Sequence, residues 1–269
     1  MQRCLLREFS CVLVSTSCLL ILILTGCSGS LELNSRWTNQ KLAITGDGSH
    51  WKDSTLEIRG PEVSVGVKND NDYLYIGLIT SNSATQLQML TLGCTAWFDT
   101  TGKYNKTFGI QFPVSGLLQG RRFPTQENQG EIKRLVDAAQ GQLAICGPGE
   151  NEQHRFSLRN AGGVEARLGY VDGTLTYELK VPLQKSTKQP NAINTDMAKP
   201  LFVGFETGDL AAAMRAQQGG SSSSQSSGGR GRGGRSDGGG GVGTGYGIDM
   251  PDPLKHWITI HLASGLPAK

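Results

Sequence analysis

The sequence predicts an all-β fold, a two-sheet antiparallel β-sandwich of jelly-roll or immunoglobulin-like type with a disordered Gly/Ser-rich insertion. Apolar residues recur with a period of two along several successive segments, which is the pattern of strands with one buried face. Turns rich in Asn, Asp and Gly separate these segments. Strands of this kind bury their apolar faces when one sheet covers another.

The N-terminal residues have the organisation of an export signal. Arg3 and Arg7 precede an apolar run of 14 residues, Cys11–Leu24, which is too short to span a bilayer. The run leads into Leu24-Thr25-Gly26-Cys27. This tetrad resembles the lipobox of bacterial lipoproteins, in which the peptide is cut before the cysteine and the thiol receives diacylglycerol.

The resemblance implies a lipoprotein signal peptide over residues 1–26 and lipidation of Cys27. We therefore expect a protein held by a lipid anchor at the cell envelope, facing the periplasm or the exterior. Ser28 stands where an aspartate would signal retention in the inner membrane, so the outer membrane is favoured. An ordinary signal peptide that contains Cys27 and a short membrane anchor are the alternatives.

Charge and motif content argue against several classes of function. The formal net charge is +3, and removal of residues 1–26 lowers it to +2, so there is no electrostatic case for nucleic acid as a partner. The sequence has no Cys-x-x-Cys, His-Glu-x-x-His or Gly-x-Ser-x-Gly motif, and we expect no enzyme. A pair of carboxylates meeting across a cleft would escape this search.

Two cysteines remain once the signal segment and Cys27 are set aside. Cys94 and Cys146 form an even pair in a chain expected outside the cytoplasm, where a disulfide between them could form. Two unpaired core thiols are the alternative.

Taken in order, residues 27–40 are expected to be a polar tether and Lys41–Thr45 a strand. Gly46-Asp47-Gly48 marks a tight turn before Trp51. Three hairpins are expected: Val63–Leu78 around Asn69–Asp72, Leu92–Pro113 around Thr100–Asn105, and Val164–Val181 around Asp172-Gly173. In the second hairpin one face carries Leu92, Cys94, Ala96 and Phe98. Further strands are expected at Leu143–Cys146, around Phe156, at Leu201–Thr207 and at Trp257–Leu262.

The remaining segments are polar. Arg121–Gln140 is expected to be a surface excursion with a short helix at Ile132, Leu135 and Val136. In Gly219–Gly247, 21 of 29 residues are Gly or Ser, so this stretch cannot bury enough apolar surface to fold. Because a strand with the same alternation follows it, we expect one domain over 41–263, interrupted by a flexible insertion over 210–254.

Four motifs occur in an order that is similar to the family 9 carbohydrate-binding modules and the wider group of DOMON-like domains. They are Gly46–Trp51, Asn69–Ile76, Ala96–Asp99 and Tyr177–Pro182. The resemblance implies a β-sandwich that binds sugars, sometimes with structural calcium, and some DOMON relatives bind haem. The size of this chain and its Gly-rich insertion depart from the sugar-binding type.

Alternation also predicts aromatic side chains on the outer faces of the sheets. If Phe98 faces the core, Trp97 faces away, and the same count turns Trp257, Tyr73 and Tyr75 outward. Exposed aromatic rings can stack on the C–H faces of a sugar, which makes these four residues candidate ligand contacts. Coverage of the rings by loops is the alternative.

Acidic residues in turns are candidate ligands for Ca²⁺, which prefers oxygen donors. They are Asp47, Asp70 and Asp72, and ordinary Asx turns explain the same residues without metal. Haem would need an axial ligand, for which His256 and His261 are the nearest choices. The sequence thus favours an envelope-anchored, non-catalytic carbohydrate-binding lipoprotein. The alternatives are a structural lipoprotein that binds another envelope protein and, third, a haem-binding domain.

Overall fold

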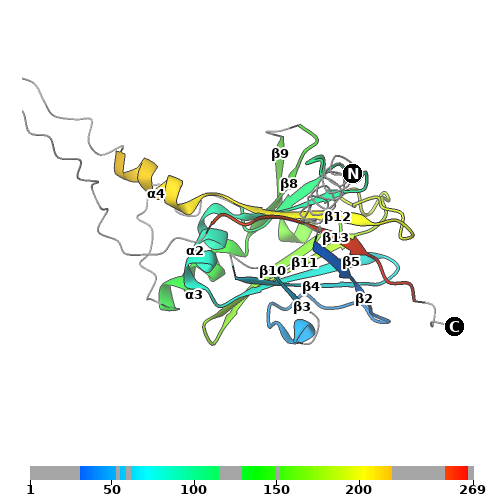
Figure 1. Cartoon of the computed structure of the whole chain (residues 1–269), viewed down its shortest axis with the longest axis horizontal. Coiled ribbons are helices and arrows are strands. Elements are labelled where there is room, and N and C mark those ends of the chain that lie inside the picture. The colour runs from blue at the N-terminus through cyan, green and yellow to red at the C-terminus, as the bar shows by residue number, and fades with distance from the viewer. Residues whose placement is uncertain are drawn as a thin grey trace, which may run out of the picture. The chain divides into compact units, whose positions relative to one another are not determined.

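The protein is seen here in a computed structural model that describes residues 31–52, 55–58, 62–114, 129–149, 152–219 and 252–265. The described residues form two β-sheets packed as layers, so the predicted β-sandwich is confirmed (Figure 1). Cys27 and the predicted signal peptide lie outside these residues. None of the described helices is long and apolar enough to cross a membrane.

One layer is a seven-stranded sheet, here called sheet A, and the other is a six-stranded sheet, sheet B. In spatial order sheet A contains β1 (Leu31–Asn34), β13 (Lys255–His261), β12 (Leu201–Thr207), β6 (Cys94–Asp99), β7 (Gly109–Gln111), β8 (Gln142–Cys146) and β9 (Gln153–Ser157). Sheet B contains β10 (Glu165–Val171), β11 (Thr174–Pro182), β5 (Tyr73–Thr80), β4 (Val63–Asn69) and β2 (Arg36–Trp37), with β3 (Thr55–Ile58) also paired to β4.

All three predicted hairpins are present. β4 pairs with β5, β6 with β7, and β10 with β11, each antiparallel. Asp172 and Gly173 have φ values of 49° and 78°, the left-handed conformation that a two-residue type I′ hairpin turn requires. The predicted strands after residue 140 correspond to β8, β9, β12 and β13.

In β11 the alternate apolar residues of the sequence form one buried face of the strand. Leu175, Tyr177, Leu179 and Val181 are fully buried between the sheets. The ring of Tyr177 lies 5.8 Å from that of Phe112, which belongs to the opposite layer. Each of these side chains contributes about 1.5–3 kcal/mol to folding through burial.

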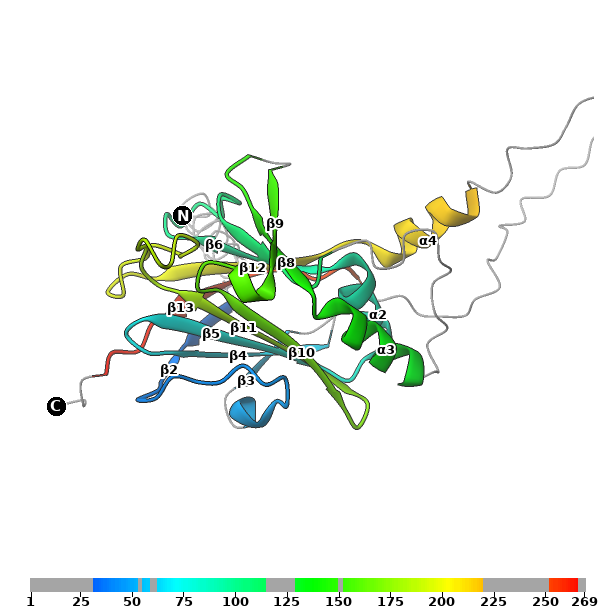
Figure 2. The ribbon, with the colours of Figure 1, turned by 180° about the vertical axis from the view of Figure 1, so that it is seen from behind.

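Two helices close one end of the sandwich, α2 (Ser83–Leu92) and α3 (Gln129–Ala139) (Figures 1 and 2). α2 contacts β5 and β12, one strand from each layer, while α3 packs against α2 and β10. The hydrophobic period gives no signal for α2, because every residue from Ala84 to Thr91 is buried, polar ones included, and the helix has no exposed face. Leu92 ends α2, so its predicted place on the strand face of Cys94 is wrong.

The helix predicted within Arg121–Gln140 is confirmed as α3. Ile132 and Val136 are both buried, so the helix is part of the packed body and does not stand apart on the surface. Residues 115–128 lie outside the described part of the chain.

The folded body begins earlier than predicted. β1 adds to the edge of sheet A and β2 pairs in parallel with β4, so the tether predicted over 27–40 is wrong from Leu31 onward. These strands are too short for alternation to reveal them. Lys41–Thr45, predicted as a strand, has no partner strand and instead crosses the outer face of sheet B, where the backbone N–H of Thr45 donates to Glu178.

The insertion is shorter than the predicted range 210–254. Leu210–Gly219 forms helix α4, which continues from β12. At the other end Leu254 is buried; its backbone C=O accepts from Thr207 N (2.9 Å), and its backbone N–H donates to the side-chain hydroxyl of Thr207 (3.0 Å). β12 and β13 pair with each other, so the chain returns to the same sheet after the insertion. The rest of the Gly/Ser-rich core 219–247 lies outside the described residues.

Each of the four tryptophans of the chain lies over a glycine. The pairs are Trp37 on Gly265, Trp51 on Gly77, Trp97 on Gly109, and Trp257 on Gly204. A Cβ atom at any of these glycines would fall 2.2–2.6 Å from an indole atom, closer than packed atoms approach. The missing side chain therefore lets each ring lie directly against the backbone at that glycine.

Candidate functional site

The motif residues near Gly46 and Glu178 meet in a structural cluster on the outer face of sheet B. Glu178 is fully buried, and its carboxylate accepts hydrogen bonds from Thr45 N (2.8 Å), Gly46 N (2.7 Å) and Trp51 Nε1 (3.0 Å). A buried carboxylate needs donors of this kind to offset its lost hydration. These motif residues therefore hold the segment before β3 against the sheet, and the Glu178 carboxylate is used within the protein.

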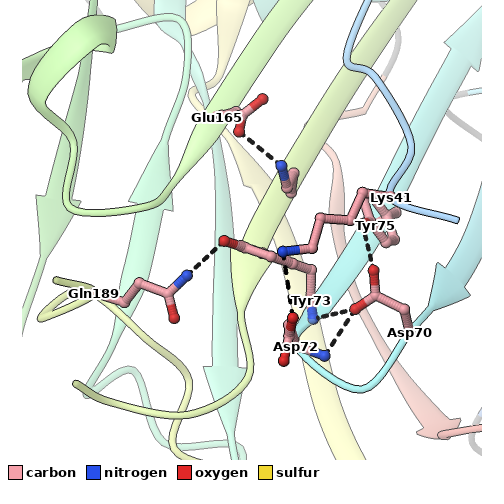
Figure 3. A network of polar contacts seen from close by, with 8 residues as sticks. Lys41, Asp70, Asp72, Tyr73, Tyr75, Glu165 and Gln189 are labelled. Atoms are coloured by element: carbon pink, nitrogen blue, oxygen red, sulfur yellow. Dashed lines mark hydrogen bonds and ion pairs between the residues drawn. The ribbon is translucent and has the colours of Figure 1, made fainter.

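The tyrosines of β5 belong to a second satisfied network, shown in Figure 3. Asp70 accepts from the backbone N–H groups of Asp72 and Tyr73 (2.7 Å each) and from the hydroxyl of Tyr75 (2.7 Å). Tyr75 is fully buried, and burial together with its bond to Asp70 raises the pKa of its hydroxyl. It presents no surface on which a sugar could stack.

Tyr73 is half-buried between two lysines. Lys180 Nζ lies 4.4 Å from the ring centroid and Lys41 Nζ lies 5.2 Å from it. Each lysine has an acidic partner, Glu165 at 2.7 Å for Lys180 and Asp72 at 3.4 Å for Lys41 (Figure 3). The structure thus places Tyr73 and Tyr75 on the opposite sheet from Trp97 and Trp257.

The turn carboxylates act as Asx residues. Asp70 is used as described, and Asp47 accepts from Ser49 N (2.8 Å); hydrogen bonds from Ser49 lower the pKa of Asp47. Among the described residues no group of three or more His, Cys, Asp and Glu side chains could hold a metal ion. Calcium binding at Asp47, Asp70 and Asp72 stays a prediction.

The two outward tryptophans do come together, on the outer face of sheet A. Trp97 on β6 and Trp257 on β13 both pair with Gly204 of β12, which lies between them. Trp257 lies over Gly204, and Trp97 leans the other way, over Gly109 of β7. In each case three indole atoms are almost equally close to the glycine position, so both rings lie flat on the sheet.

The spacing of the two rings follows from the register. Gly204, Trp97 and Gly109 lie opposite one another on three adjacent strands. Since strands are about 4.8 Å apart, the two covered glycines are about 10 Å apart across the sheet. The half-buried indoles thus form a flat pair whose long direction crosses the strands, here called the Trp97/Trp257 platform.

Charged side chains border this platform. Glu206 Oε2 accepts from Trp97 Nε1 (3.1 Å) and from Lys106 Nζ (2.6 Å), and Lys106 Nζ lies 5.9 Å from the Trp97 ring centroid. Together with Lys255 these groups line a hollow of about 230 Å³ between the two indoles. No hydrogen bond from another described residue reaches Glu206 Oε1.

The loop after β6 adds a third ring. Tyr104 is 45% exposed and meets Trp257 edge to face at 5.4 Å. Asp99 shapes this loop, because its carboxylate accepts from the backbone N–H groups of Thr101, Lys103 and Asn105. Burial acts to raise the pKa of Asp99, but hydrogen bonds, those from Thr101 foremost, leave it below its usual value.

The disulfide considered for Cys94 and Cys146 is not formed. Both cysteines are free and buried, and β7 separates their strands. Cys94 lies on the inner face of sheet A, whereas Cys146 pairs with Gly109 and so lies on the outer face. Two strand spacings and opposite faces put the sulfurs beyond bonding reach. Burial raises the pKa of Cys94 to about 12, so it is an inert core thiol.

The histidines considered for haem do not converge. His256 and His261 are five residues apart on β13 and therefore point to opposite faces of the strand. His261 lies 3.6 Å from Glu32. One iron could not take both as axial ligands without rearrangement of the strand.

Alternation identified Trp97 and Trp257, but sequence reasoning missed the residues that complete their surroundings. Lys106, Glu206 and Tyr104 reach the platform from separate segments, and pairing register alone decides that they meet. One signal was available: Gly204 stands at an outward position of a strand, where a bare glycine indicates close approach of another group.

Comparison with known proteins finds similarity in solved structures only. No protein-family model and no curated protein matches the chain. It is similar to a carbohydrate-binding module of family 9 from Caldicellulosiruptor kristjanssonii in complex with glucose, with 7% identity over 88% of this chain and 100% of that one and a TM-score of 0.39. The chain is also similar to a family 9 module from the same organism in complex with cellotriose. The identity is 8% over 90% of this chain and 100% of that one, and the TM-score is 0.35.

Proposed function

We propose that the protein is a non-catalytic carbohydrate-binding lipoprotein that holds an extended glycan on the Trp97/Trp257 platform. The observation that supports this most directly is the pair of half-buried indoles lying flat over Gly109 and Gly204, each with part of its surface accessible. Flat aromatic rings suit the C–H faces of sugars, and a large ring buries enough apolar area to add appreciably to affinity.

The polar border supplies what stacking alone lacks. Sugar hydroxyls need hydrogen-bond partners when they leave water, and Glu206, Lys106 and Lys255 offer an acceptor and two donors beside the rings. Glu206 is partly occupied by Trp97 and Lys106, which fixes its position before a ligand arrives. A site of this kind binds by orientation and shape, in keeping with recognition and not with catalysis.

The geometry also favours a direction for the ligand. Since the rings are about 10 Å apart across the strands, two sugars of one chain could stack on them only if the chain runs across β12, β6 and β7. An extended, flat polysaccharide meets this demand better than a single sugar or a branched one. Anchoring through Cys27 would hold such a module against the envelope, where it could retain a glycan of the cell wall or surface.

The test is a glycan array followed by affinity measurement on the best ligand with Trp97→Ala and Trp257→Ala. Loss of one stacked ring should weaken binding about tenfold, because about 1.4 kcal/mol corresponds to a factor of ten. Tyr170→Ala is the matched control, since it removes a half-buried ring from β10 on the other sheet. Unchanged affinity of both tryptophan variants would remove the platform from the proposal.

The anchor has its own test. Cys27→Ser should abolish labelling with a radioactive fatty acid and release the protein from the membrane fraction. A variant that stays labelled would contradict the lipoprotein assignment, without bearing on glycan binding by the sandwich.

A further inference from the structure

We propose that β9 is an open sheet edge that accepts an extended acidic segment of a partner protein as an added strand. This interaction surface is independent of the Trp97/Trp257 platform. It rests on the backbone groups of β9, on its charge, and on a comparison with the edge of sheet B.

The ladder between β8 and β9 determines which backbone groups are free. Gly147 N donates to Glu152 O (2.9 Å) at one end, and Leu158 N donates to Gly141 O (3.4 Å) at the other. Hydrogen-bonded pairs alternate with non-bonded pairs in an antiparallel ladder. The bonded pairs between these ends are therefore Ile145 with His154 and Leu143 with Phe156.

The other three residues of β9 point their backbone groups away from β8. Gln153, Arg155 and Ser157 each direct an N–H away from β8, and Gln153 and Arg155 also direct a C=O away from it, so the ladder to β8 uses none of these groups. The C=O of Ser157 belongs to the N-cap of the short helix Leu158–Asn160. All three are exposed. Figure 2 shows β9 at the outer end of sheet A, projecting beyond the strands of sheet B.

The edge of sheet B is protected, and that of β9 is not. Midway along β10, the Gln140 side chain donates to Leu168 O (2.7 Å) and accepts from Leu168 N (3.3 Å), so it occupies the position of a neighbouring strand. Among the described residues no side chain plugs β9 in this way, and the strand has no proline, no lysine and an unbroken register without a bulge. A plug, a proline and a bulge are common devices against edge pairing; β9 shows none of these three, and its charged residue is Arg155.

Charge selects the partner. Arg155 is at the centre of β9, and His154 and Arg159 lie nearby, while Glu152 at the end pairs with His154 (3.3 Å). A second copy pairing symmetrically about Arg155 would set this arginine opposite itself, which is destabilising. A carboxylate opposite Arg155, followed by an apolar residue beside half-buried Phe156, fits both faces of the strand.

The experiment measures binding of a short fluorescent peptide of alternating Glu and Val to the folded protein, with the Lys and Val analogue as control. We expect the acidic peptide to bind at least about tenfold more tightly. On binding, amide hydrogen exchange should slow at Gln153, Arg155 and Ser157 and stay unchanged at His154 and Phe156, because only the outward amides gain partners.

Two variants separate backbone pairing from simple charge attraction. Arg155→Pro removes the central outward N–H donor and keeps the hydrogen bonds between β9 and β8, so it should abolish binding. Arg155→Ala removes only the charge and keeps that donor. It should bind the acidic peptide more weakly than wild type, with the same pattern of amide exchange. Equal binding of both peptides, binding that survives Arg155→Pro, or no change in exchange at the outward amides would overturn the proposal. So would a dimer that Arg155→Pro dissociates, since the edge would then belong to a second copy.

Discussion

The two outer faces of the sandwich carry the same local packing with opposite consequences. On sheet B, Trp51 lies over Gly77 and is 1% exposed, because residues 41–52 cross the sheet and Glu178 holds them there. On sheet A, Trp97 and Trp257 lie over Gly109 and Gly204 in the same manner but are only half-buried. An indole on a glycine is thus a structural unit when a segment covers it and a candidate binding surface when none does.

The largest effect should come from the covered face. In Glu178→Ala the N–H groups of Thr45, Gly46 and Trp51 lose their acceptor inside the protein. Each unsatisfied donor costs about 1–3 kcal/mol, so we expect a loss of about 3–5 kcal/mol in the free energy of unfolding, measured by urea denaturation. Glu206→Ala is the control on the open face and should lose less than about 1 kcal/mol. Similar losses for the two variants would contradict the distinction between the faces.

A matched pair of glycine substitutions sharpens the same contrast. Gly77→Ala would place a Cβ 2.4 Å from Trp51, which is enclosed and cannot move, so stability should fall by about 1–3 kcal/mol. Gly204→Ala would place a Cβ 2.6 Å from Trp257, which can move outward into solvent. The free energy of unfolding should therefore change by less than about 1 kcal/mol, while glycan affinity should fall. Thermal unfolding and glycan titration of both variants measure the two effects, and a reversed order would refute this reading.

Acid should weaken the open face through Asp99. Because the pKa of Asp99 in the folded protein is lowered, its stabilising effect is fully present above the ordinary carboxyl value of about 4 and is lost as pH falls through the folded value. Order in the loop that carries Tyr104 should therefore decline in strong acid, seen as increased tyrosine accessibility or weaker glycan binding. In Asp99→Asn the loop should be less ordered at neutral pH and should lack this acid transition. If Asp99→Asn shows the same pH dependence of loop order as wild type, the acid transition belongs to another group.

The smallest effect on stability is expected for Lys106→Ala. Its ion pair with Glu206 is well exposed, with 49% and 31% of the two side chains accessible, so its removal should change the free energy of unfolding by less than about 0.5 kcal/mol. Glycan affinity should change by a larger factor than stability, because Lys106 borders the Trp97 ring. Urea denaturation and titration on one preparation compare the two, and a large stability loss without a change in affinity would make Lys106 structural.

Much of the fold could be predicted from the sequence because its longer strands show several repeats of the apolar alternation. Seven residues of β4 and nine of β11 show alternation plainly, and Asp172-Gly173 specifies its turn locally. α2 could not be read, because a helix buried on all sides has no exposed face to give it a period. The two-residue strand β2 is too short to show any period at all.

The sequence by itself determined which side chains point outward from each sheet, since a strand turns successive residues to opposite faces whatever its neighbours are. It therefore identified Trp97 and Trp257, and equally Tyr73 and Tyr75. Only the tertiary structure decided which of these rings stay open, because coverage depends on segments distant in the chain: residues 41–52 cross sheet B and bury Tyr75. Strand order likewise brought Glu206 and Lys106 beside Trp97 and kept Cys94 from Cys146, for no local pattern encodes which strands become neighbours.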